Sequence, residues 1–272
     1  MRVFVFGLGY AAQAVAARVG GEVVGTTRDG RGGSVRFDDE AAVQRELRLA
    51  THVLSSVPPD AEGDPVLRAY GGALGGAWLG YLSSTGVYGD AGGAWVDESA
   101  ATGGRRGERV RADAAWLALG ARVFRLPGIY GPGRSALERV QEGKAHLTRI
   151  PDQVFSRVHV DDIASGVVAG FAGPAGAYNL ADDAPCSQDD VIAFAASLLG
   201  LPLPRVVPLE ALSPMARGFY AENRRVANGK AKRVLGWQPR YPDYRAGLRA
   251  VSAMTSPTPA SVAPMTASGD QR

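Results

Sequence analysis

Cysteine is almost absent from this sequence: Cys186 is the only one among 272 residues. One cysteine excludes an internal disulfide, and we interpret it as a buried or surface thiol rather than a nucleophile. No apolar run approaches the ~20 residues of a membrane-spanning helix. The N-terminus has neither the basic lead nor the small-residue cleavage site of a signal peptide. These absences predict a soluble, cytoplasmic protein without a membrane partner.

Lysine is also scarce, so arginine supplies most of the positive charge in a chain of net charge +3. Arginine can bind phosphate through two parallel hydrogen bonds, which suits a phosphate-bearing ligand. The sequence has no basic arm and no alternation of aromatic and basic residues, the patterns typical of nucleic-acid binding. We therefore expect a small-molecule substrate and no nucleic acid. The only protein partner anticipated is a second copy of the chain, in a homodimer.

The first residues have the pattern of a dinucleotide-binding unit. The apolar run Val3 to Phe6 is typical of a strand buried on both faces of a parallel sheet, and an Ala-rich segment with helical spacing follows it. Between them, one glycine allows a tight turn, the next lets the backbone approach a pyrophosphate, and the helix N-terminus attracts phosphate. The alternative is a plain turn in another α/β protein. The predicted cofactor-binding residues here are Gly7, Leu8, Gly9, Tyr10, Ala11 and Ala12.

The end of the second strand, Glu22 to Thr26, predicts which cofactor binds. About 20 positions after the first glycine, NAD-binding units have an acidic residue, whereas this chain has Arg28. Arginine suits the 2′-phosphate of NADP, so NADP is the first choice and NAD the second; the alternative is a solvated arginine. Asp38, after the short third strand 34–37, is interpreted either as an adenine contact or as the cap of the helix that starts at Asp39.

A family resemblance begins at the expected fifth strand, Trp78 to Val87. The stretch Tyr81 to Asp90, YLSSTGVYGD, resembles the strand-end signature of extended short-chain dehydrogenases/reductases, the nucleotide-sugar epimerase and dehydratase superfamily. Four later segments resemble the same family in the same order, so the resemblance covers about residues 1 to 249. They are Arg125 to Gly133, Arg157 to Ala164, Gly176 to Leu180 and Val226 to Pro239.

The resemblance implies an α/β fold, a doubly wound parallel sheet (Rossmann) with a small C-terminal substrate lobe. We expect the NAD(P)-binding core in residues 1–130 and the lobe, interleaved with the last sheet strands, in 131–250. Residues 251–272 are rich in Ser, Thr, Pro and Ala, which predicts a disordered tail. The family's cofactor contacts fall on Ser55 and Ser56, near the end of the fourth strand (51–57), on Arg109 and on Pro127.

The family's activity implies an NAD(P)-dependent oxidoreductase or epimerase acting on a small carbonyl or hydroxyl substrate, with nucleotide-linked substrates included. In the family, a tyrosine transfers the proton, a lysine four residues later lowers its pKa, and a Ser or Thr of the fifth strand orients the substrate oxygen. Ser84 matches that hydroxyl; the alternative is a hydrogen bond to backbone. The Tyr–Lys pair is missing, because neither residue occurs between Asp90 and Ile129.

The helix that should carry the pair is expected at about Glu108 to Leu119. A match through Asp113 puts Arg105 and Arg109 at the Tyr and Lys positions, with Arg111 as a competitor. An arginine can replace the lysine as a cation near the ribose. It cannot replace the tyrosine, because guanidinium keeps its proton up to a pKa above ~12. The sequence therefore predicts an altered proton relay, or else a non-catalytic NADP-binding sensor or scaffold.

Three candidates remain for the missing chemistry. Tyr88 is the nearest phenol in the sequence and is the candidate proton donor, against a packing role; a water held by Ser84 is the other option. Arg134 is expected to reach an anionic substrate or to lie on the surface. His159 is the acid–base candidate of the substrate region, against a structural role. Asp161 and Asp162 are expected to cap the helix 163–171, and no metal site is predicted.

Overall fold

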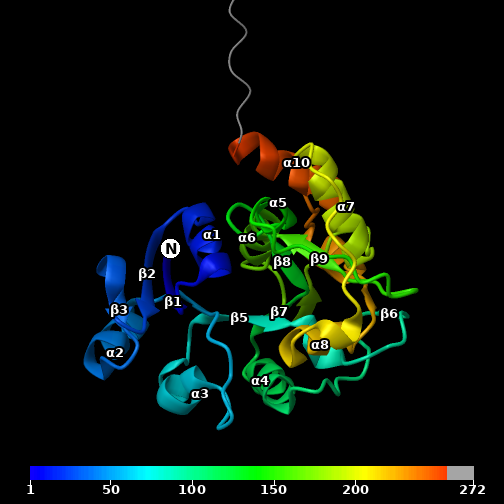
Figure 1. Ribbon diagram of the computed structural model, residues 1–272. Helices are drawn as coiled ribbons and strands as arrows, with labels where there is room; N and C mark the ends of the chain where they lie inside the picture. Colours follow the sequence, from blue (N-terminus) through cyan, green and yellow to red (C-terminus); the bar gives the residue numbers. More distant parts are fainter. Residues whose placement is uncertain (256–272) are drawn as a thin grey trace, which may run out of the picture.

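The computed structural model describes residues 1–255 and is built around one parallel sheet (Figure 1). Its strand order is β10-β7-β5-β4-β1-β2-β3, and every neighbouring pair is parallel. The chain runs outward from β1 to β3, then returns to the other side of β1 at β4. Ligands of such sheets bind at this switch point, beyond the carboxyl ends of the strands. The strands are β1 Arg2–Phe6, β2 Glu22–Thr27, β3 Val35–Arg36, β4 His52–Ser55, β5 Trp78–Ser84, β7 Arg122–Leu126 and β10 Gly176–Asn179.

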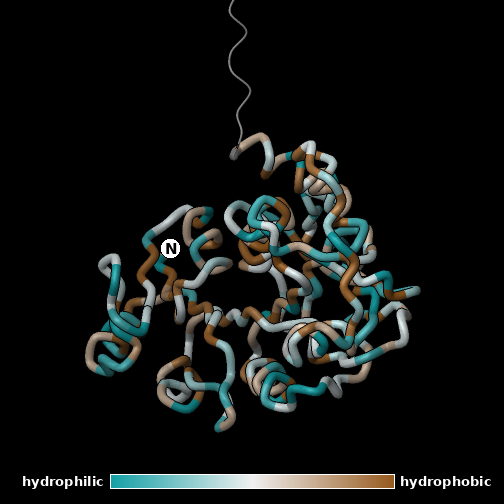
Figure 2. Tube along the Cα trace, in the orientation of Figure 1, coloured by the Kyte–Doolittle hydropathy of each residue, from teal (hydrophilic) through white to brown (hydrophobic). Residues whose placement is uncertain are grey.

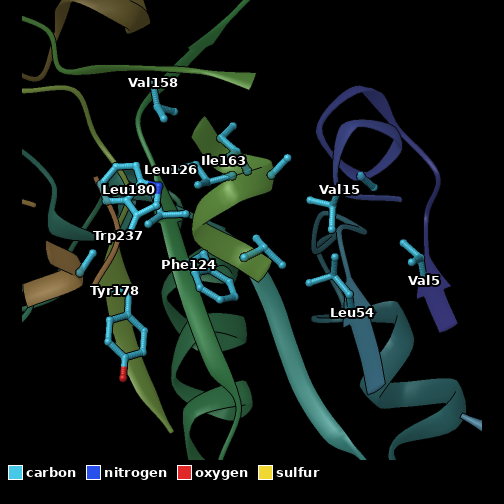
Figure 3. Packing of buried hydrophobic residues seen from close by; sticks show 14 of the residues in the cluster. Val5, Val15, Leu54, Phe124, Leu126, Val158, Ile163, Tyr178, Leu180 and Trp237 are labelled. Atoms are coloured by element: carbon cyan, nitrogen blue, oxygen red, sulfur yellow. The ribbon is translucent and has the colours of Figure 1, made fainter. Parts of the chain in front are cut away.

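Helices cover both faces of the sheet (Figure 1), and most buried side chains of the central strands are hydrophobic (Figure 2). On one face lie α1 (Tyr10–Arg18) and α6 (Val160–Ala169), and their side chains Val15 and Ile163 pack with Leu54 and Phe124 of the strands (Figure 3). The other face is covered by α2 (Glu40–Leu49), α3 (Pro65–Tyr70) and α4 (Gly107–Ala118). The predicted doubly wound α/β fold is confirmed.

The C-terminal lobe has a hydrophobic core of its own, formed where Leu137, Ile192 and Leu248 meet. Two short parallel pairs, β8 with β9 and β6 with β11, tie this lobe to the sheet, and β10 returns to its edge. The lobe's elements are β6 Trp95–Val96, β8 Gly128–Tyr130, α5 Ala136–Gln141, β9 Arg157–His159, α7 Gln188–Leu198, α8 Pro214–Tyr220, β11 Arg225–Val226, α9 Gly229–Leu235 and α10 Tyr244–Thr255.

The start of α6 differs from the prediction. His159 is the N-cap, and its Nδ1 accepts the Asp161 N–H at 3.2 Å. Helix caps by Asp161 and Asp162 are therefore wrong, because α6 begins at Val160, three residues before the predicted start, and both aspartates lie inside its first turn. The Asp162 carboxylate instead accepts the backbone N–H groups of Arg240 and Tyr241, at 2.7 and 3.1 Å.

The C-terminal end also differs. Helix α10 continues to Thr255, and the Val251 side chain is fully buried in the core of the lobe. A disordered tail from residue 251 is therefore wrong for residues 251–255, because the apolar positions Tyr244, Leu248 and Val251 recur at helical spacing. The rest of the predicted tail, 256–272, lies outside the described residues.

Within residues 1–255, no helix is long and apolar enough to cross a membrane. The same residues contain no group of three His, Cys, Asp or Glu side chains that could hold a metal ion.

Candidate functional site

A cleft of about 1310 Å³ opens beyond the carboxyl ends of the central strands. The segments that follow β1, β4, β5 and β7 form its floor, and the C-terminal lobe forms its opposite wall. Of the residues predicted to bind cofactor or substrate, eight line this cleft: Gly9, Tyr10, Ala11, Ser56, Ser84, Arg109, Pro127 and Arg134.

The glycine turn after β1 is fixed by hydrogen bonds to neighbouring segments of the chain on one side and is accessible from the cleft on the other. Gly7 has a φ of +80°, a conformation that favours glycine, and its N–H donates to Thr26 Oγ1 at 3.0 Å. Its carbonyl accepts the Ser56 hydroxyl. Leu8 packs closely on Gly25, where a Cβ would lie 2.5 Å from the leucine. A Cβ added at Gly9 would meet nothing within 4 Å, so the backbone there is accessible from the cleft.

Helix α1 presents unpaired donors to this opening. The first N–H with a partner inside the helix is that of Gln13, which donates to the Gly9 carbonyl at 2.9 Å. The N–H groups of Tyr10, Ala11 and Ala12 precede it, and the positive end of the helix dipole lies among them. Ala12 itself is fully buried against the sheet, which explains why a small residue is needed at this position.

Tyr10 connects the two walls of the cleft. Its hydroxyl donates to the Pro132 carbonyl at 3.0 Å, and the Arg134 guanidinium lies over its ring at 5.6 Å from the centroid. Burial raises the pKa of Tyr10, so the phenol stays protonated and keeps this hydrogen bond. Arg134 is thereby held at the cleft, beside the N-terminus of α1.

The groups predicted to select the cofactor lie at the end of β2. Arg28 is exposed and makes no hydrogen bond or ion pair with a described residue. Asp38 pairs with Arg36 at 2.8 Å, whereas Asp39 caps α2 by accepting the Ala42 N–H at 3.0 Å. The capping alternative for Asp38 is therefore wrong.

The two serines after β4 separate in space. Ser55 is fully buried and lies below the cleft floor, where its Oγ accepts the Val57 N–H at 3.4 Å. Ser56 is the one of the pair that lines the cleft.

Ser84 ends β5, where its hydroxyl makes the predicted backbone hydrogen bond and the residue also lines the cleft. Its Oγ accepts the Gly86 N–H at 3.1 Å, capping the short helical turn Thr85–Tyr88. The same residue lines the cleft, so the hydroxyl proton can be donated to a ligand.

Tyr88 and His159 lie outside the cleft. The Tyr88 hydroxyl donates to Asn179 Oδ1 at 2.7 Å and accepts from Arg125 at 3.0 Å, and burial raises its pKa. His159 is 1% exposed between Tyr130 and Tyr241, and burial lowers its pKa. These contacts favour the packing role for Tyr88 and the structural role for His159 over the proton-donor and substrate roles.

Arginines stand where the family's Tyr–Lys pair is expected. Arg105, Arg106 and Arg109 all line the cleft. Arg105 donates to Glu222 at 3.0 Å and to the Gly218 carbonyl at 2.6 Å, which links the loop before α4 to the lobe. Arg106 and Arg109 make no side-chain hydrogen bond or ion pair with a described residue. The competitor Arg111 does not line the cleft.

Two features of the site were not predicted. One is a buried network below the cleft floor, in which Asp113 pairs with Arg125 at 2.7 Å and accepts from Ser83 at 2.6 Å. The arginine inside an apolar strand was a signal for it, because a buried charge needs a partner. The other is a wall of aromatic side chains in the lobe, around Phe155 and Phe219, for which the sequence carries no periodic signal.

Comparisons with known proteins show what this chain resembles in sequence and in fold. No protein-family model matches. A Streptomyces 3-diazoavenalumate denitrifying reductase is 34% identical over 142 residues, 48% of this chain and 46% of the relative, so the chain spans about half the length of that protein. A functionally unknown conserved protein from Silicibacter pomeroyi is 40% identical, with a TM-score of 0.82 over 93% of this chain and 98% of that one. The Thermus thermophilus UDP-glucose 4-epimerase, solved with NAD, has a TM-score of 0.72 at 21% identity, over 95% and 100% of the chains.

Proposed function

We propose that this chain, which belongs to the extended short-chain dehydrogenase/reductase superfamily of epimerase/dehydratase-like proteins, is an NAD(P)-dependent oxidoreductase. The observation that carries the proposal is the opening at Gly9 to Ala11. There an unobstructed backbone, free N–H groups and a helix dipole meet inside the cleft at the switch point of the sheet. Such an arrangement suits the pyrophosphate of a dinucleotide. The similarity to a reductase and to an epimerase solved with NAD supports the same cofactor class.

Four groups that line the cleft have roles in this proposal. The N–H groups at the start of α1 hold the pyrophosphate, with Arg134 as the neighbouring cation. Arg109 takes the place of the lysine beside the nicotinamide ribose. A dinucleotide held there would supply the hydride chemistry, and Ser84 would donate a hydrogen bond to the substrate oxygen.

Proton transfer differs from the family's relay in this proposal. Arg105 stands at the phenol position, and its guanidinium can stabilise negative charge but cannot give up a proton at neutral pH. The Tyr88 phenol is engaged below the cleft floor. A water held by Ser84 therefore delivers the proton. General acid–base catalysis contributes about 10² to 10⁴ in rate, so we expect a slow enzyme.

Arg28→Ala should lower the affinity for NADPH by about ten- to a hundredfold and leave that for NADH unchanged, because a charge-assisted contact to phosphate is lost. The measurement is calorimetric titration of both cofactors. Arg31→Ala is the matched control, since Arg31 lies on the same loop and its side chain is 75% exposed and 3.9 Å from the Asp29 carboxylate. Equal affinities for NADPH and NADH in the unsubstituted protein would contradict the NADP preference.

Ser84→Ala should reduce NADPH oxidation with a panel of carbonyl substrates by about tenfold, the value of one hydrogen bond to the substrate oxygen. Ser84→Thr, which keeps the hydroxyl, is the control and should retain most of the rate. A non-catalytic sensor would instead bind NADPH tightly and turn over no substrate. Full activity in Ser84→Ala would place the chemistry elsewhere in the cleft.

A further inference from the structure

The cleft extends past the proposed cofactor site into the C-terminal lobe, where three aromatic rings form one wall. Phe155 and Phe219 stack with centroids 4.4 Å apart and an interplanar angle of 15°. Tyr220 meets both rings edge to face, at 5.8 and 5.4 Å. Phe219 is nevertheless 52% exposed, so one face of the stack is available to a ligand. Aromatic rings prefer such offset or edge contacts with another ring.

A cation without a side-chain partner among the described residues lines the same cleft. Arg139 of α5 lines the cleft, is exposed, and makes no side-chain hydrogen bond or ion pair with a described residue. Arg157 also lines the cleft, but its guanidinium is already bound to carbonyl groups and to Gln188.

A histidine lies on the loop that follows the helix of this cation. The N–H groups of Lys144 and Ala145 donate to the Arg139 carbonyl, at 2.9 and 3.0 Å. This fold-back brings the next residue, His146, to the cleft, where its Nε2 is buried without a hydrogen-bond partner. A buried imidazole nitrogen is normally paired, so this atom is available for a ligand.

Each carboxylate that lines the cleft already has a hydrogen-bond or ion-pair partner. Glu138 accepts the N–H groups of Gly133 and Ser135 in a capping box, at 2.9 and 2.8 Å. Glu142 pairs with Lys144 at 2.7 Å, and Glu222 pairs with two arginines. The charges left free are therefore positive. The cleft also exceeds the ~300–1,000 Å³ of most single-ligand pockets, which leaves space for a second ligand.

We infer that this end of the cleft binds a planar aromatic carboxylate, whose ring stacks on Phe219 and whose carboxylate is held by Arg139 and His146. The inference rests on the proposed oxidoreductase function and names the substrate class for it. One guanidinium offers a two-pronged contact that matches the two oxygens of a carboxylate. A nucleotide diphosphate carries more negative charge than this single cation can pair.

The test uses trans-cinnamate as the probe, titrated calorimetrically into the full chain with and without saturating NADPH. We expect binding of cinnamate and at least tenfold weaker binding of cinnamamide, which has the same shape without the charge. Saturated 3-cyclohexylpropanoate, charged but not planar, should also bind at least tenfold more weakly. UDP-glucose, the nucleotide-linked comparison, should not displace cinnamate.

Arg139→Gln should lower the affinity for cinnamate by about ten- to a hundredfold, and Phe219→Leu by about tenfold. Lys144→Gln is the matched control. It also removes one positive charge, from the loop that follows α5, at a side chain that is 72% exposed. It should bind cinnamate normally. NADPH affinity should be the same in all three variants, which also shows that each is folded.

The outcomes separate this inference from the proposed function. NADPH binding without cinnamate binding overturns the substrate class alone. Equal binding of cinnamate and cinnamamide, or equal losses in Arg139→Gln and Lys144→Gln, also overturns it. Cinnamate binding with the expected variant effects, in a protein that does not bind NADPH, would contradict the proposed oxidoreductase and leave the carboxylate site standing.

Discussion

Gly9→Val abolishes NADPH binding while the protein remains folded. The φ of Gly9 is −82°, which any residue can adopt, and a Cβ there meets nothing within 4 Å. The valine side chain therefore enters the cleft without disturbing the turn, and fills the space in which a pyrophosphate would approach the backbone. We expect a loss of at least about a hundredfold in affinity, equal to ~2.7 kcal/mol or more. Calorimetric titration measures this loss, and circular dichroism follows the thermal midpoint.

Two other glycines serve as controls for this result. Gly20→Val adds the same side chain at a site that is equally open but lies outside the cleft, after α1; it should bind NADPH normally. Gly7→Val should instead destabilise the fold, because Gly7 has a φ of +80° and its Cβ would lie 3.0 Å from Val57. Normal NADPH binding by Gly9→Val would show that this turn is not the phosphate site.

The sheet could be predicted because its strands are short apolar runs that end at clear turn signals. Val3–Phe6 stops at a glycine, and the fourth strand stops before Pro58. Helix α4 was predicted within one residue at each end, since its buried positions Ala112 and Trp116 recur at helical spacing. Helix ends were harder. The N-cap of α6 is a histidine, a residue that sequence rules do not favour at this position. His159 can accept the Asp161 N–H because it is the last residue of β9, directly before the helix.

The two ends of the candidate site differ in how well a sequence can reveal them. The proposed cofactor end consists mainly of one contiguous segment, so its spacing alone suggests the chemistry. The aromatic wall is assembled from Phe155 on a loop and Phe219 on α8, and its cation, Arg139, comes from α5. Only the packing of the lobe brings these residues together, and no local pattern predicts that.

Tyr88 illustrates a second limit of the sequence. A hydroxyl four residues from Ser84 is near in the chain, but the turn Thr85–Tyr88 directs it below the sheet edge, toward Asn179 and Arg125. The direction of a side chain after a strand depends on the turn that follows. Residue type and spacing could therefore nominate this phenol but could not place it.

Asp113→Ala should lower the free energy of unfolding by about 3–5 kcal/mol, the usual effect of leaving one partner of a buried ion pair alone. The side chains of Asp113 and Arg125 are 2% and 4% exposed, and the guanidinium donates to both carboxylate oxygens, at 2.7 and 3.1 Å. Asp113 also accepts the Ser83 hydroxyl at 2.6 Å. The pair joins α4 to β5 and β7 directly below the cleft. Urea unfolding followed by tryptophan fluorescence measures the change.

A double substitution tests whether the loss comes from the uncompensated charge. In Asp113→Leu with Arg125→Met, both charges are replaced by apolar side chains of similar length, so no buried ion remains unpaired. Replacing a buried pair in this way is often neutral, and we expect the double variant to recover most of the stability that Asp113→Ala loses. If it is as unstable as the single variant, the carboxylate acts mainly through its hydrogen bond to Ser83.

The single variant has a contradicting outcome of its own. If Asp113→Ala unfolds at the same urea concentration as the unsubstituted protein, the pair does not hold α4 to the sheet. The arginines that α4 brings to the cleft must then be positioned by the packing of Trp116.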